Sequence, residues 1–159
     1  MPDTMTKEQR HNCMSRIRGK DTRPEMVVRR WLHSEGFRYS LHSRKLPGCP
    51  DIVLRRYHTV IFINGCFWHG HPGCDKFRMP RSNVEFWQEK IRRNKERDAQ
   101  EVAALEALGW NVIVVWECEL SRQTRDLTLR NLVDAVRRNI EPELIHPIPL
   151  SVRKLSLKE

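Results

Sequence analysis

The chain has 159 residues, of which 39% are hydrophobic and 31% charged, so it has enough apolar material for one folded domain and too much for a disordered chain. Lysine and arginine outnumber aspartate and glutamate by 29 to 20, and the resulting formal charge of +9 favours a polyanion as partner. No apolar run approaches the roughly 20 residues that a membrane helix needs. The first residues also lack the apolar stretch of a signal peptide, so we expect a cytoplasmic protein without membrane contact.

The first half of the chain carries two helix starts followed by strand patterns. Residues 6–9 form a capping-box pattern that predicts a short polar helix ending near Ile17. Residues 22–25 form a second such pattern, and the helix that follows has an apolar face and is expected to stop at Gly36. Strands are then predicted over residues 37–41, 51–54 and 59–63, with a turn at 46–50.

The second half begins with a loop and ends with a helix. Residues 64–80 hold glycine, proline, histidine and cysteine without periodicity, which predicts a loop built around a metal. A long helix, capped by Asn83 and closed by Gly109, follows this loop. The remaining predicted elements are a strand over 110–116 and a helix over 126–138.

This order of elements predicts an α/β fold in which helices flank a mixed central sheet. We expect a single domain over residues 1–140, because no internal repeat or linker interrupts it. The basic, proline-containing tail over residues 141–159 is expected to be poorly ordered.

A cluster of metal-binding side chains lies in the predicted loop. Cys66, His69, His71 and Cys74 fall within nine residues, and Cys118 follows the last strand. Thiolate and imidazole are the ligands that zinc prefers, and a closed structural site takes four of them. We predict a zinc site formed by Cys66, His71, Cys74 and Cys118. His69 is then the candidate that does not bind zinc, and it can point to the opposite side of the loop. The other two cysteines are interpreted as ordinary thiols.

Asp51 begins a strand directly after a turn that contains proline and glycine. If the two strands form a hairpin centred on Tyr57, Asp51 faces Ile63 at the mouth of the loop. A carboxylate beside a main-chain oxygen provides part of a magnesium site, because magnesium prefers oxygen ligands. The alternative is an aspartate that only caps the turn.

Asp98 is placed unusually for a carboxylate. The long helix is expected to bury one stripe of side chains: Val84, Trp87, Ile91, Val102, Leu105 and Leu108. Asp98 lies on that stripe, where a carboxylate is costly unless it is paired or bound to metal. We therefore predict that Asp98 orients His69 or contacts metal-bound water. Glu25 is a weaker candidate, because a capping box explains an acid at that position.

Two aromatic residues, Phe67 and Trp68, stand inside the loop between a predicted zinc ligand and His69. Aromatic side chains on a loop of a basic protein can insert between bases, and Met14 on the first helix is a second candidate for this role. The alternative is that both rings pack under the loop as a small core.

These motifs resemble the very short patch repair (Vsr) DNA mismatch endonucleases between residues 7 and 122. The matching stretches are NxMxxI at 12–17, DTxxE at 21–25, LPGxPD at 46–51, GCFWHxH at 65–71, EFWxxKIxxNxxRD at 85–98, LGW at 108–110 and VWEC at 115–118. The resemblance implies a restriction-endonuclease-like core, a structural zinc and magnesium-dependent nicking of DNA with a 5′-phosphate product.

The resemblance also implies roles for single residues. Asp51 and the main-chain oxygen of Ile63 would bind magnesium, His69 would activate water, and Asp98 and Glu25 would hold His69 or metal-bound waters. Cys66, His71, Cys74 and Cys118 would bind zinc, and Met14, Phe67 and Trp68 would intercalate. Asn64 stands where some members have a histidine, so one imidazole of such sites is absent here.

The function that follows is a strand-specific nickase acting on double-stranded DNA at a T:G mismatch. The resemblance implies a functional link to a DNA cytosine methyltransferase and to general mismatch repair proteins. Two alternatives are a restriction-like nickase that cuts a fixed sequence and a non-catalytic DNA-binding module that is stabilised by zinc.

Overall fold

A computed structural model describes residues 6–17 and 19–139, and the tail predicted over 141–159 lies outside these residues. The elements are α1 (Lys7–Ser15), α2 (Arg23–Ser34), β1 (Ser40–Leu41), β2 (Ile52–Leu54), the 3-10 turn η1 (Arg55–Tyr57), β3 (Thr59–Asn64), α3 (Val84–Ala107), β4 (Asn111–Trp116), the 3-10 turn η2 (Glu117–Leu120) and α4 (Arg125–Arg138). Their order agrees with the order predicted from the sequence.

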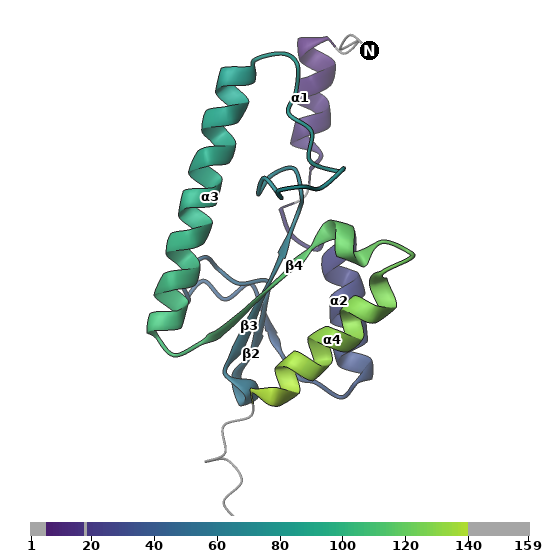
Figure 1. The fold of residues 1–159 in the computed structure, drawn as a ribbon, viewed down its shortest axis with the longest axis vertical. Helices are drawn as coiled ribbons and strands as arrows, with labels where there is room; N and C mark the ends of the chain where they lie inside the picture. The colour runs from purple at the N-terminus through teal and green to yellow at the C-terminus, as the bar shows by residue number, and fades with distance from the viewer. Residues whose placement is uncertain (1–5, 18, 140–159) are drawn as a thin grey trace, which may run out of the picture.

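The sheet has four strands in the order β1-β2-β3-β4. β1 and β2 pair antiparallel, as do β2 and β3, whereas β3 and β4 run parallel. The parallel pair requires a crossover, and α3 provides it. Helices α2 and α4 cover one face of the sheet, and α3 lies on the other side (Figure 1). This confirms the predicted α/β fold with a mixed sheet.

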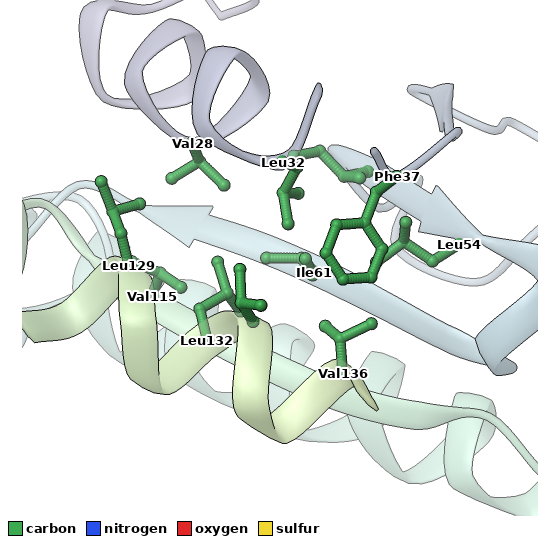
Figure 2. Packing of buried hydrophobic residues seen from close by; sticks show 11 residues of the cluster. Val28, Leu32, Phe37, Leu54, Ile61, Val115, Leu129, Leu132 and Val136 are labelled. Carbon is green, nitrogen blue, oxygen red and sulfur yellow. The ribbon is translucent and has the colours of Figure 1, made fainter. Parts of the chain in front are cut away.

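The larger core lies between the sheet and the α2–α4 layer. Figure 2 shows side chains of α2, β3 and α4 meeting there, among them Val28, Ile61 and Leu132. A smaller cluster on the α3 side contains Val60 and Leu105. A fully buried aliphatic side chain contributes about 1.5–3 kcal/mol relative to an exposed one, so these clusters fix the helices on the sheet.

All three predicted helix starts coincide with the observed N-cap residues, but the complete predicted capping box forms only at α1. At α1, Thr6 accepts from the Gln9 N–H and the Gln9 side chain accepts from the Thr6 N–H, which completes a capping box. At α2, the Thr22 side chain accepts from the Glu25 N–H. At α3, Asn83 is the N-cap residue as predicted, but it is left-handed and its side chain makes no capping hydrogen bond.

The predicted register of the β2–β3 hairpin is wrong by one residue. Ile52 pairs with Ile61 and Leu54 with Thr59, which leaves residues 55–58 as the connection. A connection with an even number of residues cannot be centred on a single residue such as Tyr57. Asp51 is therefore not the cross-strand partner of Ile63.

Two further expectations need correction. The strand predicted over 37–41 is limited to Ser40 and Leu41, because Phe37 turns into the core instead of pairing with β2. Val84 and Leu108 do not belong to the buried stripe of α3, since 37% and 59% of their surfaces are exposed. The 24 residues of α3 span about 36 Å and the six-residue strands about 20 Å, so the helix is longer than the strands that it packs against.

None of the helices within residues 6–17 and 19–139 is long and apolar enough to cross a membrane.

Candidate active site and metal centre

A groove of about 1590 Å³ runs along the side of the sheet that faces α3. Its walls come from the start of α2, the end of β3, the loop after β3 and the middle of α3. All four predicted catalytic residues line it, and so do three other predicted site residues: Glu25, Asp51, His69 and Asp98, with Ile63, Asn64 and Trp68. The fold thus gathers in one concave surface residues that are spread over the first two-thirds of the chain.

Asp51 stands at the entrance to β2 with its side chain 19% exposed. Its Oδ2 accepts a hydrogen bond of 2.7 Å from the Ile63 N–H, although the two residues are not paired in the ladder. Burial raises the pKa of Asp51, and the Ile63 hydrogen bond opposes this only in part. A half-buried carboxylate with one oxygen already held is a suitable ligand for a hard cation.

Glu25 is buried at the start of α2, and its carboxylate is fully engaged there. It accepts from the Thr22 hydroxyl at 3.1 Å, from the Asp21 N–H at 3.1 Å and from Arg29 at 2.7 Å. Its other neighbour is the His42 ring, 3.5 Å away. Glu25 therefore lies on the Asp51 side of the groove, and among these contacts of the described residues none involves His69.

His69 and Asp98 form a close pair across the groove. The His69 Nδ1 lies 2.6 Å from the Asp98 Oδ2, and both side chains are 25% exposed. Asp98 is thus only half-buried, contrary to the expectation of a buried carboxylate on the apolar stripe. A hydrogen bond from Nδ1 to a carboxylate leaves Nε2 as the acceptor, which is the form that a general base needs.

The backbone of the loop positions His69 against α3. Gly70 has a φ of +58°, and a Cβ at that residue would lie 2.7 Å from the Ile91 Cγ2 and 2.6 Å from the Lys95 Cε. A larger residue would therefore push the loop away from α3. The Asn94 side chain donates to the Trp68 carbonyl at 2.8 Å, which fixes the residue before His69.

Cys66, His71, Cys74 and Cys118 form one cluster, in which their ligand atoms all lie within 4.8 Å of one another. Cys66 is buried, and the His71 ring stacks on Trp116 with centroids 4.1 Å apart. His69 points to Asp98 instead and takes no part in the cluster. The structure therefore separates the two imidazoles in the way that the sequence predicted.

The chemistry of the four side chains fits a divalent metal. Burial and the neighbouring Cys66 and Cys74 raise the pKa of the Cys118 thiol to about 12, so the thiolate form of Cys118 is disfavoured unless a cation is close to it. A bound metal ion removes this conflict, because it stabilises each thiolate directly. Three sulfurs and one nitrogen are the donor set of a structural zinc site.

Phe67 and Trp68 belong to an aromatic cluster rather than standing alone. The Phe67 ring lies 5.2 Å from Trp68 and 5.4 Å from Trp87 on α3, both edge to face. The Lys90 ammonium lies 5.5 Å from the Trp68 ring centroid and 5.7 Å from that of Trp87. Both loop rings are half-buried, so they pack on α3 and still offer surface to a ligand.

Of the remaining predicted residues, Asn64 lines the groove, whereas Met14 is not among the described residues that line it. Met14 is half-buried on α1, which stands beside the N-terminal part of α3 (Figure 1). Arg10 of the same helix donates to the Ser82 hydroxyl at 3.3 Å, which ties α1 to the segment before α3. Asn64 ends β3 and lines the groove.

Several residues of the site were missed by sequence reasoning. The sequence pattern places Trp87 only in the core and gives Lys90 no role. Arg29 could have been found, because it stands four residues after Glu25, the spacing of a helical ion pair. His42 carried no signal, since a lone histidine after a short strand has no pattern.

Comparison of the sequence with known proteins identifies its family. Residues 2–76 match the family model described as DNA mismatch endonuclease Vsr. The DNA mismatch endonuclease Vsr of Escherichia coli strain K12 is 42% identical over 120 residues, which cover 76% of each chain. The chain belongs to the Vsr family. Members of this family are DNA endonucleases, so the chain is a DNA-cutting enzyme and DNA is its substrate.

Other Vsr-like relatives are named as nicking enzymes. The type II nicking enzyme V.XorIIP of Xanthomonas oryzae pv. oryzae is 47% identical over 135 residues, 84% of this chain and 98% of the relative. The type II nicking enzyme V.NmeAIP of Neisseria meningitidis is 46% identical over 141 residues, 86% of this chain and all of the relative. Together with the Vsr family, these relatives identify the chain as a DNA nicking endonuclease.

Proposed function

We propose that the chain nicks one strand of double-stranded DNA beside a T:G mismatch, in very short patch repair, with magnesium as the catalytic ion. The observation that carries this proposal is the placement of the Asp51 carboxylate and the His69–Asp98 pair in one groove. The basic character of the chain supports a DNA duplex as the occupant of that groove. Membership in an endonuclease family argues against a non-catalytic binding module.

Asp51, with the main-chain oxygen of Ile63, would hold the magnesium ion. The Ile63 N–H already fixes one oxygen of the carboxylate, so Asp51 is oriented before any ion binds. When bound, magnesium supplies positive charge that polarises the scissile phosphate. Asn64 follows directly, and its uncharged amide would contribute hydrogen bonds only.

His69 would act as the general base. Its Nε2 takes the proton of the attacking water, while Asp98 keeps the ring in the required tautomer and stabilises the resulting imidazolium. The water oxygen bonds to phosphorus and the bond to the 3′ oxygen breaks, which leaves a 5′-phosphate and a 3′-hydroxyl. The leaving oxygen takes its proton from solvent.

The proposal for the active site is tested with a T:G duplex in which each strand carries a different label. With Mg²⁺ the purified protein should cut one strand only and leave a 5′-phosphate, and EDTA should stop the reaction. Cutting of both strands, or equal rates in EDTA, would contradict the proposal.

Zinc would be the structural ion of the four-residue cluster, one per chain. A metal bond from the loop to Cys118 ties the loop to the end of β4, next to the groove. The Cys3His donor set supports zinc over magnesium for this cluster, because zinc prefers sulfur and nitrogen ligands and magnesium prefers oxygen ligands.

Removal of one cluster ligand should release the zinc. We expect Cys74→Ala to lose the ion and to unfold or precipitate, because a structural zinc site contributes directly to folding. Metal analysis and thermal melting measure this, with Cys13→Ala as the control because Cys13 is exposed on α1. A Cys74→Ala protein with normal zinc content and melting temperature would disprove the structural role.

Phe67 and Trp68 would unstack the DNA at the mismatch. Contacts to phosphates contribute the same binding energy on any duplex. Inserting a ring between base pairs costs a few kcal/mol, because the bases must first be unstacked. That cost is lower at a wobble pair, so the rings favour the mismatched duplex. The Lys90 ammonium lies beside the Trp68 ring, so it places a positive charge next to a side chain that is proposed to insert between the bases.

We expect Trp68→Ala to lower the ratio of T:G to T:A cutting, with little change in non-specific binding or its salt dependence. The double variant of Phe67 and Trp68 to alanine should lose most nicking. Zinc content and melting temperature are measured on the same samples, because loss of a loop core would lower both. A folded, zinc-loaded Trp68→Ala protein with unchanged mismatch preference would show that the Trp68 ring does not insert between base pairs at the mismatch.

A restriction-like nickase that cuts a fixed sequence is the second candidate, favoured by the relatives named type II nicking enzymes. The functional links to a DNA cytosine methyltransferase and to general mismatch repair proteins belong to the first candidate. A DNA substrate also supports the cytoplasmic localisation expected from the sequence.

A further inference from the structure

His42 occupies an unusual backbone position directly opposite Asp51. Its φ is +45°, in the left-handed region that few residues other than glycine adopt. The His42 N–H donates to the Asp51 carbonyl at 3.2 Å, so the two residues are joined where β1 and β2 part. Residues held in such conformations cluster at functional sites. The backbone therefore brings this ring to the proposed magnesium ligand.

The His42 ring is held by Arg29. The Nε2 of His42 lies 2.8 Å from the Arg29 Nη2, and a guanidinium can only donate. Nε2 must then be the acceptor, which assigns the single ring proton to Nδ1. Arg29 thus selects the tautomer of His42, in the same way that Asp98 selects the tautomer of His69.

Arg29 is itself fixed on both sides. It donates to the Asp21 Oδ1 at 2.6 Å and to the Glu25 Oε2 at 2.7 Å, and its side chain is only 7% exposed. Asp21, Glu25 and His42 lie close enough together to hold a metal ion, but the guanidinium already bonds to all three. Arg29 is therefore the cation of this cluster, and the cluster serves as a rigid support.

The other side of the His42 ring faces Asp51. The His42 Nδ1 lies 3.7 Å from the Asp51 Oδ1, while the Asp51 Oδ2 accepts from the Ile63 N–H at 2.7 Å. A separation of 3.7 Å is longer than a hydrogen bond, and a shift of the carboxylate by about 1 Å would bring Oδ1 within hydrogen-bond distance of Nδ1. The Asp51 Oδ2 therefore has a hydrogen-bond donor in the Ile63 N–H, and the His42 Nδ1 lies on the side of the other oxygen, Oδ1.

We propose that His42 is a positioning residue for Asp51. The buried Arg29–Glu25 pair orients the His42 ring, and the Nδ1–H of this ring directs the Asp51 carboxylate toward the groove. This inference rests on the proposed function, in which Asp51 binds magnesium. It assigns Glu25 a role different from the one expected: Glu25 acts through Arg29 and His42 on Asp51, and not on His69. Groups that orient a metal ligand typically change metal affinity about 10- to 100-fold.

The tautomer provides a first test that needs no DNA. Long-range ¹H–¹⁵N correlation on uniformly labelled protein at neutral pH, with His42→Gln to assign the resonances, shows which ring nitrogen carries the proton. We expect the proton on Nδ1 and an unprotonated Nε2. A proton on Nε2 would overturn the inference, because Nε2 could not then accept from Arg29.

The second test measures magnesium binding through the Ile63 amide resonance, which reports on Asp51. His42→Ala should raise the Mg²⁺ midpoint of this resonance about tenfold, whereas His42→Gln should stay within about threefold of the wild type. A glutamine can still accept from Arg29 and donate to Asp51, and an alanine can do neither. His33→Ala is the matched control, because His33 is exposed on α2.

The outcomes separate this inference from the proposed function. If the Ile63 amide of the wild type does not respond to Mg²⁺, Asp51 is no magnesium ligand, and both proposals are wrong. If the wild type responds and His42→Ala has the same midpoint, only the positioning role is wrong. A raised midpoint in His42→Ala that His42→Gln restores supports the role, because a general loss of folding would not be rescued by one amide.

Discussion

Asp51→Asn should lower the single-turnover rate of nicking by at least about 1000-fold, because a metal ion contributes several kcal/mol to the transition state and each 1.4 kcal/mol is about tenfold in rate. Asparagine keeps the shape of the side chain, and its amide oxygen can still accept from the Ile63 N–H. The change therefore removes the charge without moving the backbone. DNA binding in EDTA should persist or even tighten, since one negative charge leaves the groove.

The matched control is Asp134→Asn, which makes the same chemical change on an exposed position of α4, outside the groove. Rates on a labelled T:G duplex and binding by fluorescence anisotropy are compared for both variants. A normal nicking rate for Asp51→Asn would mean that Asp51 only caps its turn.

His69→Ala should slow nicking by about 10²- to 10⁴-fold, the usual contribution of a general base. Asp98→Asn should slow it by about 10²-fold or more, since an amide can favour the wrong tautomer of His69. The double variant should be little worse than His69→Ala alone, because the two side chains act as one unit through the 2.6 Å contact. The rates are measured in single-turnover reactions with excess enzyme.

Zinc content must be checked in each of these variants, because His69 lies two residues before His71, a residue of the metal cluster. Additive losses in the double variant would contradict the pairing, since independent residues contribute independently to the barrier. A His69→Ala protein with normal zinc and a normal rate would exclude the imidazole as the base.

Much of this fold was predictable because its signals are local. Capping boxes lie within four residues, and the buried run of β3 lies within one strand. The metal cluster was equally accessible, because thiol and imidazole ligands crowd into one short loop and the remaining cysteine follows a strand. The division between His69 and His71 follows from their spacing, since residues two apart in a loop can face opposite ways.

The remaining features depend on contacts between distant segments. Glu25 contacts Arg29 and His42, and the ring of His42 reaches its place only through the pairing of β1 with β2. The hairpin register depends on the length of a turn, which hydrophobic alternation does not fix. Trp87 seemed a plain core residue, because a sequence does not show that the loop rings pack against it.

The central claim, nicking at a T:G mismatch, is tested most directly by the ratio of single-turnover rates on two duplexes that differ only in that pair. With Mg²⁺ and excess enzyme, one strand of the T:G duplex should be cut at least about 100-fold faster than the same strand of the T:A duplex, because the unstacking cost of a few kcal/mol is lower at the mismatch. Equal rates on both duplexes would contradict mismatch recognition and would identify a nickase that reads sequence alone.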